Sequence, residues 1–237
     1  MKDLLLLTGK EALIINKKNQ LKNTIYKSEN LILQSDNHIE INTINDTKIL
    51  IFGNIIGLKD NESNIDTSKE IYTKYILKNS IQNIQKNIEG RFIVIKIYSN
   101  NELEITTDRF GQIDLYYKVF KDSIIIATNI KLFNRYFNLS NYDQASIIHS
   151  LYIYGFRPTK KNTLYKDIKR LGVNEIINWK ENKLNLIKNN INIYDILDYQ
   201  KKDLFSYRDI FLDAVEKRSS KNGNIVYLSS GWDSTSI

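Results

Sequence analysis

The sequence contains no cysteine, and Pro158 is its one proline among 237 residues. The absence of cysteine excludes disulfide bonds, thiolate metal sites and thiol nucleophiles within these residues. No apolar run approaches the roughly 20 residues that a membrane-spanning helix needs. The run Leu4–Leu7 is also too short for the core of a signal peptide. We therefore expect a cytoplasmic protein without a membrane partner.

What the sequence does contain is typical of a globular chain. Hydrophobic residues make up 42% and charged residues 26%, enough for one core with additional elements. The net charge is +7, but the lysines are spread along the chain among many Asn and Ile residues, so we expect no nucleic-acid partner. His38 and His149 lie far apart without ligand spacing, so we expect no histidine metal site.

Periodicity indicates strands first and then a helix. The short apolar runs Leu4–Leu7, Ala12–Ile15 and Ile49–Phe52 are predicted to be strands. Thr67-Ser68-Lys69-Glu70 has the pattern of a capping box, and apolar residues follow it at helical spacing as far as Ile88. We expect one helix here, with Gly90 at its C-terminal end.

From Arg91 onward the apolar period changes to two. A further set of elements is predicted: strands at 91–98, 102–107, 116–120 and 123–127, a helix at 141–154, a hairpin at 173–179 and 184–188, a helix at 204–218 and a strand at 225–228. This order predicts an α+β domain up to about residue 190, followed by the opening strand and loop of an α/β domain.

The last strand leads into a loop of small residues that fits a pyrophosphate. The loop's candidate binding residues are Ser229, Ser230, Gly231, Asp233, Ser234 and Thr235. Backbone N–H groups of such a loop can form an anion-binding nest, hydroxyl groups can donate to phosphate oxygens, and Asp233 can hold Mg²⁺. The alternative is an ordinary strand–turn–helix with a Ser or Asp cap.

Five segments in order resemble the asparagine synthetase family. They are Ile88–Phe92 (L-x-G-x-F), Thr107–Tyr117 (R-D-R-x-G-x-x-P-L-Y-Y), Ile126–Lys131 (F-A-S-E-I-K), Thr163–Leu171 (T-L-F-x-G-I-x-x-L) and Leu228–Ser234 (L-S-G-G-x-D-S). An RNA-modifying ATP pyrophosphatase shares the last of these, but the four upstream segments argue against it. The first 80 residues match only weakly.

The resemblance implies an N-terminal αββα sandwich of the N-terminal-nucleophile type, followed by the first strand and loop of a truncated synthetase domain. We place the glutaminase-like domain at 1–190 and the linker, helix and start of the synthetase domain at 191–237. Family members release ammonia from glutamine in the first domain. In the second they adenylate a carboxylate with ATP and Mg²⁺, and ammonia or another amine then displaces AMP.

The sequence departs from this family at three glutaminase positions. Lys2 stands where the family has its cysteine nucleophile, and a protonated lysine amine cannot form the thioester. No arginine precedes Arg91, although the family clamps the substrate carboxylate with one. Phe52 stands where the family has its oxyanion-stabilising Asn. We expect that the fold is kept and that this chain has no catalytic residue for glutamine hydrolysis.

Removal of residues 1 to 7 by self-cleavage would offer a substitute nucleophile, because Thr8 would then carry a free α-amine. The simpler alternative is that Thr8 and Gly9 end the first strand at a turn. We also expect Arg109 and Asp108 to form a buried ion pair that fixes the turn, with a substrate role as the alternative, and Trp232 to pack against a domain that these residues lack.

The expected function is therefore that of the N-terminal part of an ATP-dependent amide-forming ligase with an inactive glutaminase site. The parent would use ATP and Mg²⁺, a small-molecule or peptide carboxylate, and ammonia or an amine, whereas this chain alone is expected to bind no cofactor and to be inactive. From about residue 220 onward we expect loose packing or packing against the N-terminal domain. The alternative is a non-enzymatic docking domain that forms a homodimer or binds a partner protein.

Overall fold

The computed structural model describes residues 3–11, 13, 24–36, 39–44, 46–59, 65–137, 139–153, 161–189, 200–220, 222–225 and 231. The chain divides into two compact units, Met1–Ile191 and Asn192–Ile237. The first unit contains all the strands of the two sheets described below. The described residues of the second include the helix α5 (Lys201–Arg218).

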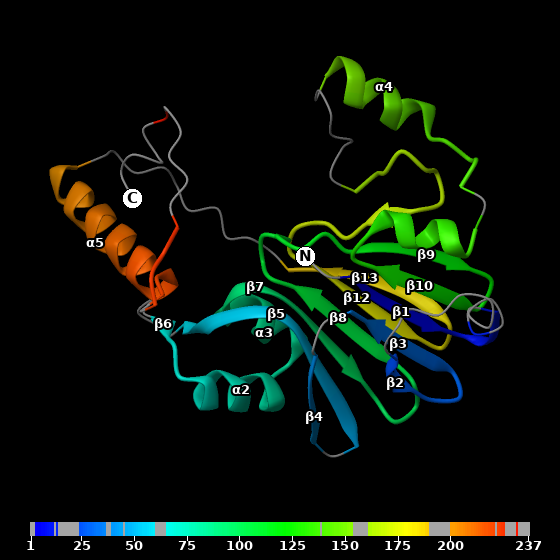
Figure 1. Ribbon diagram of the computed structural model, residues 1–237, viewed down its shortest axis with the longest axis horizontal. Coiled ribbons are helices and arrows are strands. Elements are labelled where there is room, and N and C mark those ends of the chain that lie inside the picture. The colour runs from blue at the N-terminus through cyan, green and yellow to red at the C-terminus, as the bar shows by residue number, and fades with distance from the viewer. Residues whose placement is uncertain are drawn as a thin grey trace. The chain divides into compact units, whose positions relative to one another are not determined.

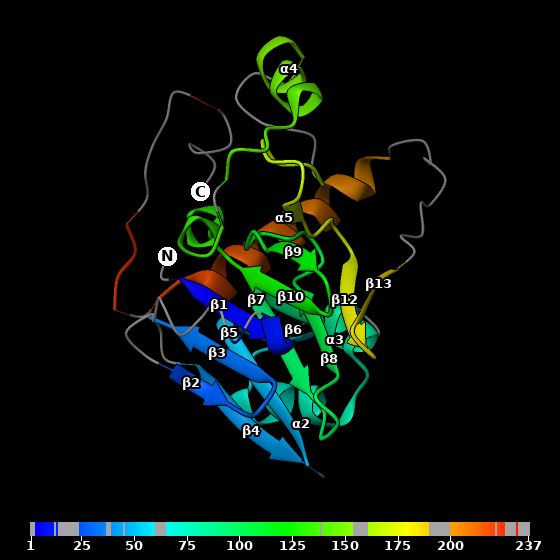
Figure 2. The ribbon, with the colours of Figure 1, turned by 90° about the vertical axis from the view of Figure 1, so that its right-hand side faces the viewer.

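Two antiparallel sheets form the first unit (Figure 1). The six-stranded sheet has the order β11-β9-β10-β1-β3-β2, formed by β11 (Lys169–Arg170), β9 (Tyr116–Phe120), β10 (Ser123–Ala127), β1 (Leu4–Thr8), β3 (Leu31–Ser35) and β2 (Thr24–Lys27). The seven-stranded sheet has the order β13-β12-β8-β7-β5-β4, formed by β13 (Lys183–Lys188), β12 (Glu175–Lys180), β8 (Leu103–Thr107), β7 (Ile88–Ile97), β5 (Thr47–Lys59) and β4 (Glu40–Ile44), with β6 (Ile65–Asp66) paired to β5. In Figure 2 the six-stranded sheet lies in front of the seven-stranded sheet.

The main core lies between the sheets, and β1 shows how the sequence builds it. Leu4 and Leu6 belong to the cluster that also contains Phe52 and Ile95 of the other sheet. Leu5 and Leu7 belong to a second cluster on the other face of β1. All four leucines are 0% exposed. A strand that is covered on both faces needs a continuous apolar run, which explains the pattern Leu4–Leu7.

Helical segments cover the outer face of each sheet. The helices α2 (Lys69–Lys78) and α3 (Ile81–Asn87) bury Ile76, Ile81 and Ile84 in a cluster with strands β5 and β7. The 3₁₀ helix η1 (Ile130–Arg135) buries Leu132 and Phe133 against β1 and β10. The predicted α+β class with two sheets between helical layers is confirmed.

The helix predicted between Thr67 and Gly90 is wrong in its details. Two short helices occupy the segment, because Ser80 accepts a hydrogen bond from the Asn83 backbone N–H and so begins a second helix. The predicted capping box is not formed: Ser68 is the N-cap of α2, and its side chain makes no capping hydrogen bond. Gly90 does not end a helix. It lies inside β7 with φ +150°.

Two other expectations need correction or stay open. At the predicted strand Ala12–Ile15, Lys10, Glu11 and Leu13 have helical backbone, and the Leu13 N–H donates to the Gly9 carbonyl at 3.2 Å, while residues 12, 14 and 15 lie outside the described residues. Of the predicted strand at 225–228, only Ile225 is described, and it is 83% exposed. This strand therefore stays a prediction.

The remaining helices agree with their predictions. The helix α4 (Gln144–Tyr152) begins at Asp143, whose carboxylate accepts a hydrogen bond from the Ser146 N–H at 3.2 Å. This bond lowers the pKa of Asp143. In α5, Gln200 and Asp203 form a capping box, and no residue of this helix is buried. None of the helices described is long and apolar enough to cross a membrane.

Candidate functional site

The sandwich has two ends, which the strand directions define. At one end β1 begins, β8 ends at Thr107, and β10 ends at Ala127. We call it the start end. At the other end β1 finishes at Thr8, and the turns after β2, β7, β9 and β12 gather. We call it the turn end.

At the start end, the residue before β1 is held on both sides. The Asp3 carbonyl accepts hydrogen bonds from Ser35 Oγ at 3.0 Å and from the Asp36 N–H at 3.2 Å. Its carboxylate accepts from Asn129 Nδ2 at 3.3 Å. On the same side, the Leu4 N–H donates to Thr128 Oγ1 at 2.9 Å. These bonds fix the direction from which the chain enters the central strand.

Beside the core, β5 and β7 approach each other too closely for a side chain at Gly53. A Cβ at Gly53 would lie 2.3 Å from the Arg91 carbonyl oxygen and 3.2 Å from Ile113 Cδ1. Gly53 also has φ +101°, which favours glycine. The preceding residue, Phe52, is 2% exposed and belongs to the core between the sheets. The Phe52 side chain therefore contributes packing and no hydrogen-bond donor.

The turn after β8 is organised by a buried carboxylate. Asp108 is 2% exposed, and it accepts hydrogen bonds from the Phe110 and Gln112 backbone N–H groups, each at 3.1 Å. Its own N–H donates to the Phe92 carbonyl at 3.0 Å, and Gln112 Nε2 donates to the Gly90 carbonyl at 3.2 Å. These bonds lock the turn onto β7.

The predicted ion pair between Asp108 and Arg109 is wrong. Backbone N–H groups and Gln112 occupy the carboxylate of Asp108, and Arg109 makes no ion pair with any described residue. The Arg109 guanidinium lies over the ring of Phe110, 4.8 Å from its centre. Since Phe110 is 58% exposed, the pair lies at the surface of the turn.

A second polar group lies where β9 begins. Arg170 Nη1 lies 3.2 Å from Asp114 Oδ1, and the Tyr116 hydroxyl donates to Asp114 Oδ2 at 3.2 Å. Burial and the nearby Asp114 carboxylate raise the pKa of Tyr116 to about 12. Close by in the chain, the buried Glu175 carboxylate pairs with Lys161 and accepts the Gly172 N–H at 2.8 Å. These contacts attach the segment before β12 to the sheets.

The structure reaches little of the predicted nucleotide loop. Of its six candidate residues only Gly231 is described, and Ser229, Ser230, Asp233, Ser234 and Thr235 lie outside the described residues, as do Trp232, Lys2 and His38. His149 lies in α4. The binding of phosphate or Mg²⁺ by this loop therefore stays a prediction.

The self-cleavage alternative at Thr8 is contradicted by the fold. Loss of residues 1 to 7 would remove Leu4–Leu7, four fully buried side chains of a central strand. The Thr8 hydroxyl is buried and donates to the Asn30 carbonyl at 3.0 Å. Gly9 follows with φ +94°. Thr8 and Gly9 thus end the strand, as the simpler alternative predicted.

A comparison with protein families identifies the family of this chain. The family described as "Glutamine amidotransferase domain" matches residues 59–190, which is more than half of the chain. This chain belongs to that family. The matched range of the glutamine amidotransferase domain contains the Asp108 turn, the contacts of Asp114 with Tyr116 and Arg170, and the Lys161–Glu175 pair. It also contains four of the five segments singled out in the sequence, while Leu228–Ser234 lies beyond it.

Solved structures and curated proteins add little to the family assignment. Two similar solved structures are glutamine phosphoribosylpyrophosphate amidotransferase from B. subtilis with ADP and GMP, and the allosteric regulatory enzyme of purine biosynthesis. Identities are 11% and 10%, and both TM-scores are 0.44. Each match covers 81% of this chain and 44% of the other, so the chain spans less than half the length of these proteins. No curated protein matches this sequence.

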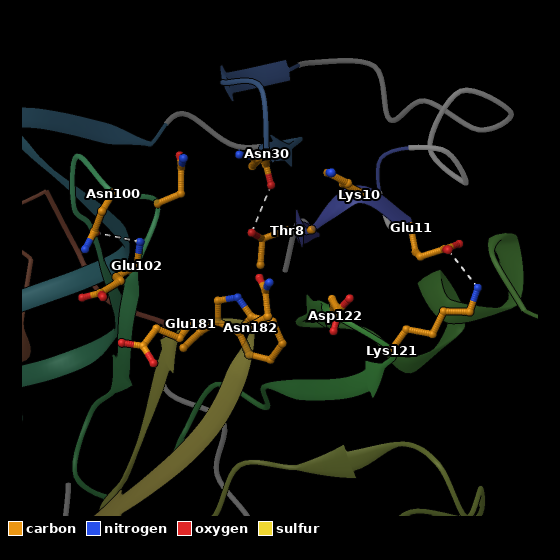
Figure 3. Close-up of a pocket in the computed structure, with 13 residues that line it drawn as sticks. Thr8, Lys10, Glu11, Asn30, Asn100, Glu102, Lys121, Asp122, Glu181 and Asn182 are labelled. Carbon is orange, nitrogen blue, oxygen red and sulfur yellow. Dashed lines mark hydrogen bonds and ion pairs between the residues drawn. The ribbon is translucent and has the colours of Figure 1, made fainter.

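The turn end holds a cavity that the sequence did not predict. Its volume is about 490 Å³, within the range of small-molecule sites. It is lined by Thr8, Gly9, Lys10, Glu11, Asn30, Asn100, Asn101, Glu102, Lys121, Asp122, Trp179, Glu181 and Asn182 (Figure 3). These residues come from segments that lie far apart in the chain, so no local sequence motif predicts the cavity. One hairpin turn gave a local signal for this site, because it has Glu181-Asn182 where Asn-Gly is usual.

Proposed function

We propose that this chain is the N-terminal part of an asparagine synthetase-like, ATP-dependent amide-forming ligase whose glutaminase site has lost its nucleophile. The observation that carries the proposal is the combination of a glutamine amidotransferase domain with a sequence that contains no cysteine. Hydrolysis of glutamine through a thioester needs a thiolate. Without it, the ammonia or amine must come from another source.

Three further features, besides the missing cysteine, support loss of the glutaminase reaction. Phe52 is committed to the core, so it offers no donor to an oxyanion. The polar groups of Asp108 already bind the protein itself. No arginine precedes Arg91 in the sequence, so a bidentate clamp for a substrate carboxylate would have to come from later in the chain.

The ligase half of the proposal rests on the sequence. The four upstream segments occur in the order of the asparagine synthetase family, and the loop with Ser229, Ser230, Gly231, Asp233, Ser234 and Thr235 follows them. In the parent protein this loop would hold the phosphates of ATP, and Asp233 would hold Mg²⁺. The carboxylate substrate would be activated as its adenylate and then attacked by ammonia or an amine. We place the protein in the cytoplasm.

The glutaminase proposal is tested by glutamate release from glutamine. We expect none from the wild-type chain, with a cysteine-containing glutamine amidotransferase domain as the positive control. The variant Lys2→Cys is expected to remain inactive because Phe52 still replaces an amide donor. Turnover by the wild type would overturn the proposal. Turnover by Lys2→Cys would show that only the nucleophile is missing.

The ligase proposal is tested by pyrophosphate release from Mg-ATP with a panel of carboxylates, using the protein with its complete reading frame. We expect release that depends on a carboxylate, with ammonia or an amine as the second substrate. Asp233→Asn is expected to abolish it, and Asp46→Asn, in an exposed turn, is the matched control. Isothermal titration of the 237-residue chain with Mg-ATP is expected to show no binding. Failure of release with every carboxylate and amine would contradict the proposal.

A docking domain is the second candidate, and α4 favours it. Three apolar residues of α4 are exposed to an unusual degree: Ile148 at 54%, Leu151 at 68% and Tyr152 at 83%. An exposed apolar patch of this kind is typical of an interaction surface. The test is light scattering of the wild type beside Leu151→Ser. A dimer that the variant converts to a monomer would favour docking through α4, whereas a monomeric wild type with ligase activity in the parent would exclude it.

A further inference from the structure

The cavity at the turn end is lined by more acidic than basic residues, whereas the chain as a whole has more basic than acidic residues. The protein as a whole has 34 basic and 27 acidic residues. The cavity is lined by four carboxylates and two amines: Glu11, Glu102, Asp122 and Glu181, with Lys10 and Lys121. A concave region with charge of one sign concentrates ligands of the other sign. The lining therefore favours a ligand with more positive than negative groups.

Some of these charges are already neutralised by the protein. Lys121 Nζ lies 2.8 Å from Glu11 Oε1. Glu102 Oε1 lies 3.3 Å from Nζ of Lys180, outside the lining. Within the described part of the chain, Asp122, Glu181 and Lys10 have no ion-pair partner. Counting only partners among the described residues, the cavity thus presents two carboxylates and one amine without an ion pair.

The charged groups are separated across the cavity. In Figure 3, Glu102 and Glu181 lie on one side, Lys10 lies on the opposite side, and Asp122 lies between Asn182 and Lys121. The amide side chains of Asn30, Asn100 and Asn182 also line the space, and each amide can donate and accept. A ligand that carried opposite charges at its two ends would match this arrangement.

Trp179 lines the cavity and is only 2% exposed. Its indole N–H is a hydrogen-bond donor. A ligand oxygen in the cavity would accept from it, which favours a ligand with a carboxylate or carbonyl over a pure amine.

The hairpin turn places Glu181 and Asn182 in the left-handed region of backbone conformation. Glu181 has φ 50° and Asn182 has φ 59°. Glycine adopts this region freely, whereas a residue with a Cβ is disfavoured there. Glu181 therefore places its carboxylate at a turn position where glycine would be energetically more favourable. A ligand-binding role accounts for this choice of residue.

We propose that the turn-end cavity binds a small molecule with two cationic groups and one carboxylate, such as a free basic amino acid. The cationic groups face Glu181 and Asp122, and the carboxylate faces Lys10. This charge count is the complement of Asp122, Glu181 and Lys10, which have no ion-pair partner in the described part of the chain. The inference does not depend on the ligase proposal, because it concerns the opposite end of the sandwich and needs neither glutaminase nor ATP chemistry.

The first experiment is an NMR titration of the 237-residue chain with L-lysine and three probes that lack one or more of its charged groups. L-lysine carries all three groups, norleucine lacks the second amine, 1,5-diaminopentane lacks the carboxylate, and glutarate lacks both amines and carries a second carboxylate. We expect lysine to bind most tightly, and loss of either type of group to weaken binding about tenfold, since hydrogen bonds to charged groups are the stronger ones. Glutarate binding as tightly as lysine, or no binding of lysine, would overturn the inference.

The second experiment places the ligand with variants. Glu181→Gln and Asp122→Asn are each expected to raise the Kd for lysine about tenfold. Lys10→Gln is expected to remove the advantage of lysine over 1,5-diaminopentane. The matched control is Asp46→Asn, an exposed left-handed turn residue outside the cavity, which should leave the Kd unchanged. Circular dichroism confirms folding of each variant. Equal Kd values for all four variants would place the lysine elsewhere and overturn the inference.

Discussion

The start end and the turn end of the sandwich use polar groups in opposite ways. At the start end, the buried Asp108 carboxylate and the carbonyl of Asp3 bind neighbouring groups of the protein. At the turn end, Asp122 and Glu181 line an open cavity without an ion-pair partner among the described residues. The first end stabilises the fold, and the second end is available to a ligand.

This difference matters because the family's glutaminase chemistry is expected beside the start of β1. In this chain Phe52 lies in the core and Gly53 lies close to β7. Asp122, Glu181 and Lys10, which have no ion-pair partner among the described residues, lie at the other end. Substitutions at the start end should therefore reduce stability, and substitutions at the turn end should change binding instead.

The largest effect is expected for Gly53→Ala. A Cβ here would lie 2.3 Å from the Arg91 carbonyl, and alanine is also strained at φ +101°. We expect a loss of about 3–5 kcal/mol in the free energy of unfolding, measured with urea. Gly111→Ala is the matched control, because its Cβ would meet no atom closer than 4.0 Å at φ +62°. It should lose only about 1–2 kcal/mol. Equal losses would contradict close packing at the start end.

The next effect is expected for Asp108→Ala. The substitution leaves the Phe110 and Gln112 N–H groups without their acceptor, and we expect a loss of about 2–4 kcal/mol. Asp108→Asn keeps one carbonyl oxygen and should lose less. Urea unfolding measures both variants. A loss below that of exposed substitutions would show that the carboxylate does not hold the turn.

At the turn end, Glu181→Gly should have a small effect of the opposite sign. Relief of the left-handed backbone at φ 50° is expected to change stability by no more than about 1 kcal/mol, in the stabilising direction. Thermal unfolding measures this change. A loss comparable to that of Asp108→Ala would remove the distinction between the two ends.

The smallest effect concerns alkaline pH. The pKa of Tyr116 is raised to about 12 from 10.0, chiefly by burial, so the folded state favours the neutral phenol. Its contribution to stability is complete below pH 10 and is lost as the pH rises toward 12. Burial raises the pKa of Tyr117 in the same direction. Tyr116→Phe should therefore reduce the fall in stability above about pH 10. Urea midpoints across this range measure it, and an unchanged slope would contradict the assignment.

Much of the fold was predictable because its strands have strong local patterns. The run Leu4–Leu7 and the pair β12–β13 appear in the structure close to their predicted bounds. The first helix was wrong because Asn79-Ser80 interrupts a nearly continuous apolar period, and Ser80 begins a new helix. The strands β2 and β4 were missed because polar residues alternate along edge strands without a continuous apolar run.

The functional site was harder to predict for a physical reason. A motif is visible when its residues are neighbours in the chain, as in the Asp108 turn or the loop ending at Thr235. The turn-end cavity assembles Lys10, Asp122 and Glu181 from three segments that lie far apart in the chain. Only the pairing of the strands brings those segments together. The sequence likewise could not show that Asp108 prefers backbone N–H groups to Arg109, since both partners lie beside it in the chain.

The pairing of β1 has a consequence for how the protein is made. β1 contacts β3 within about the first 35 residues, but its other neighbour, β10, begins only at Ser123. During synthesis, the second edge of β1, which carries four leucines that are fully buried in the folded protein, stays unpaired until more than half of the chain has been made. During that interval the nascent chain presents an apolar, unpaired strand edge to its surroundings. Slow synthesis of the segment before Ser123 would lengthen this exposure and favour capture by a chaperone or by another nascent chain.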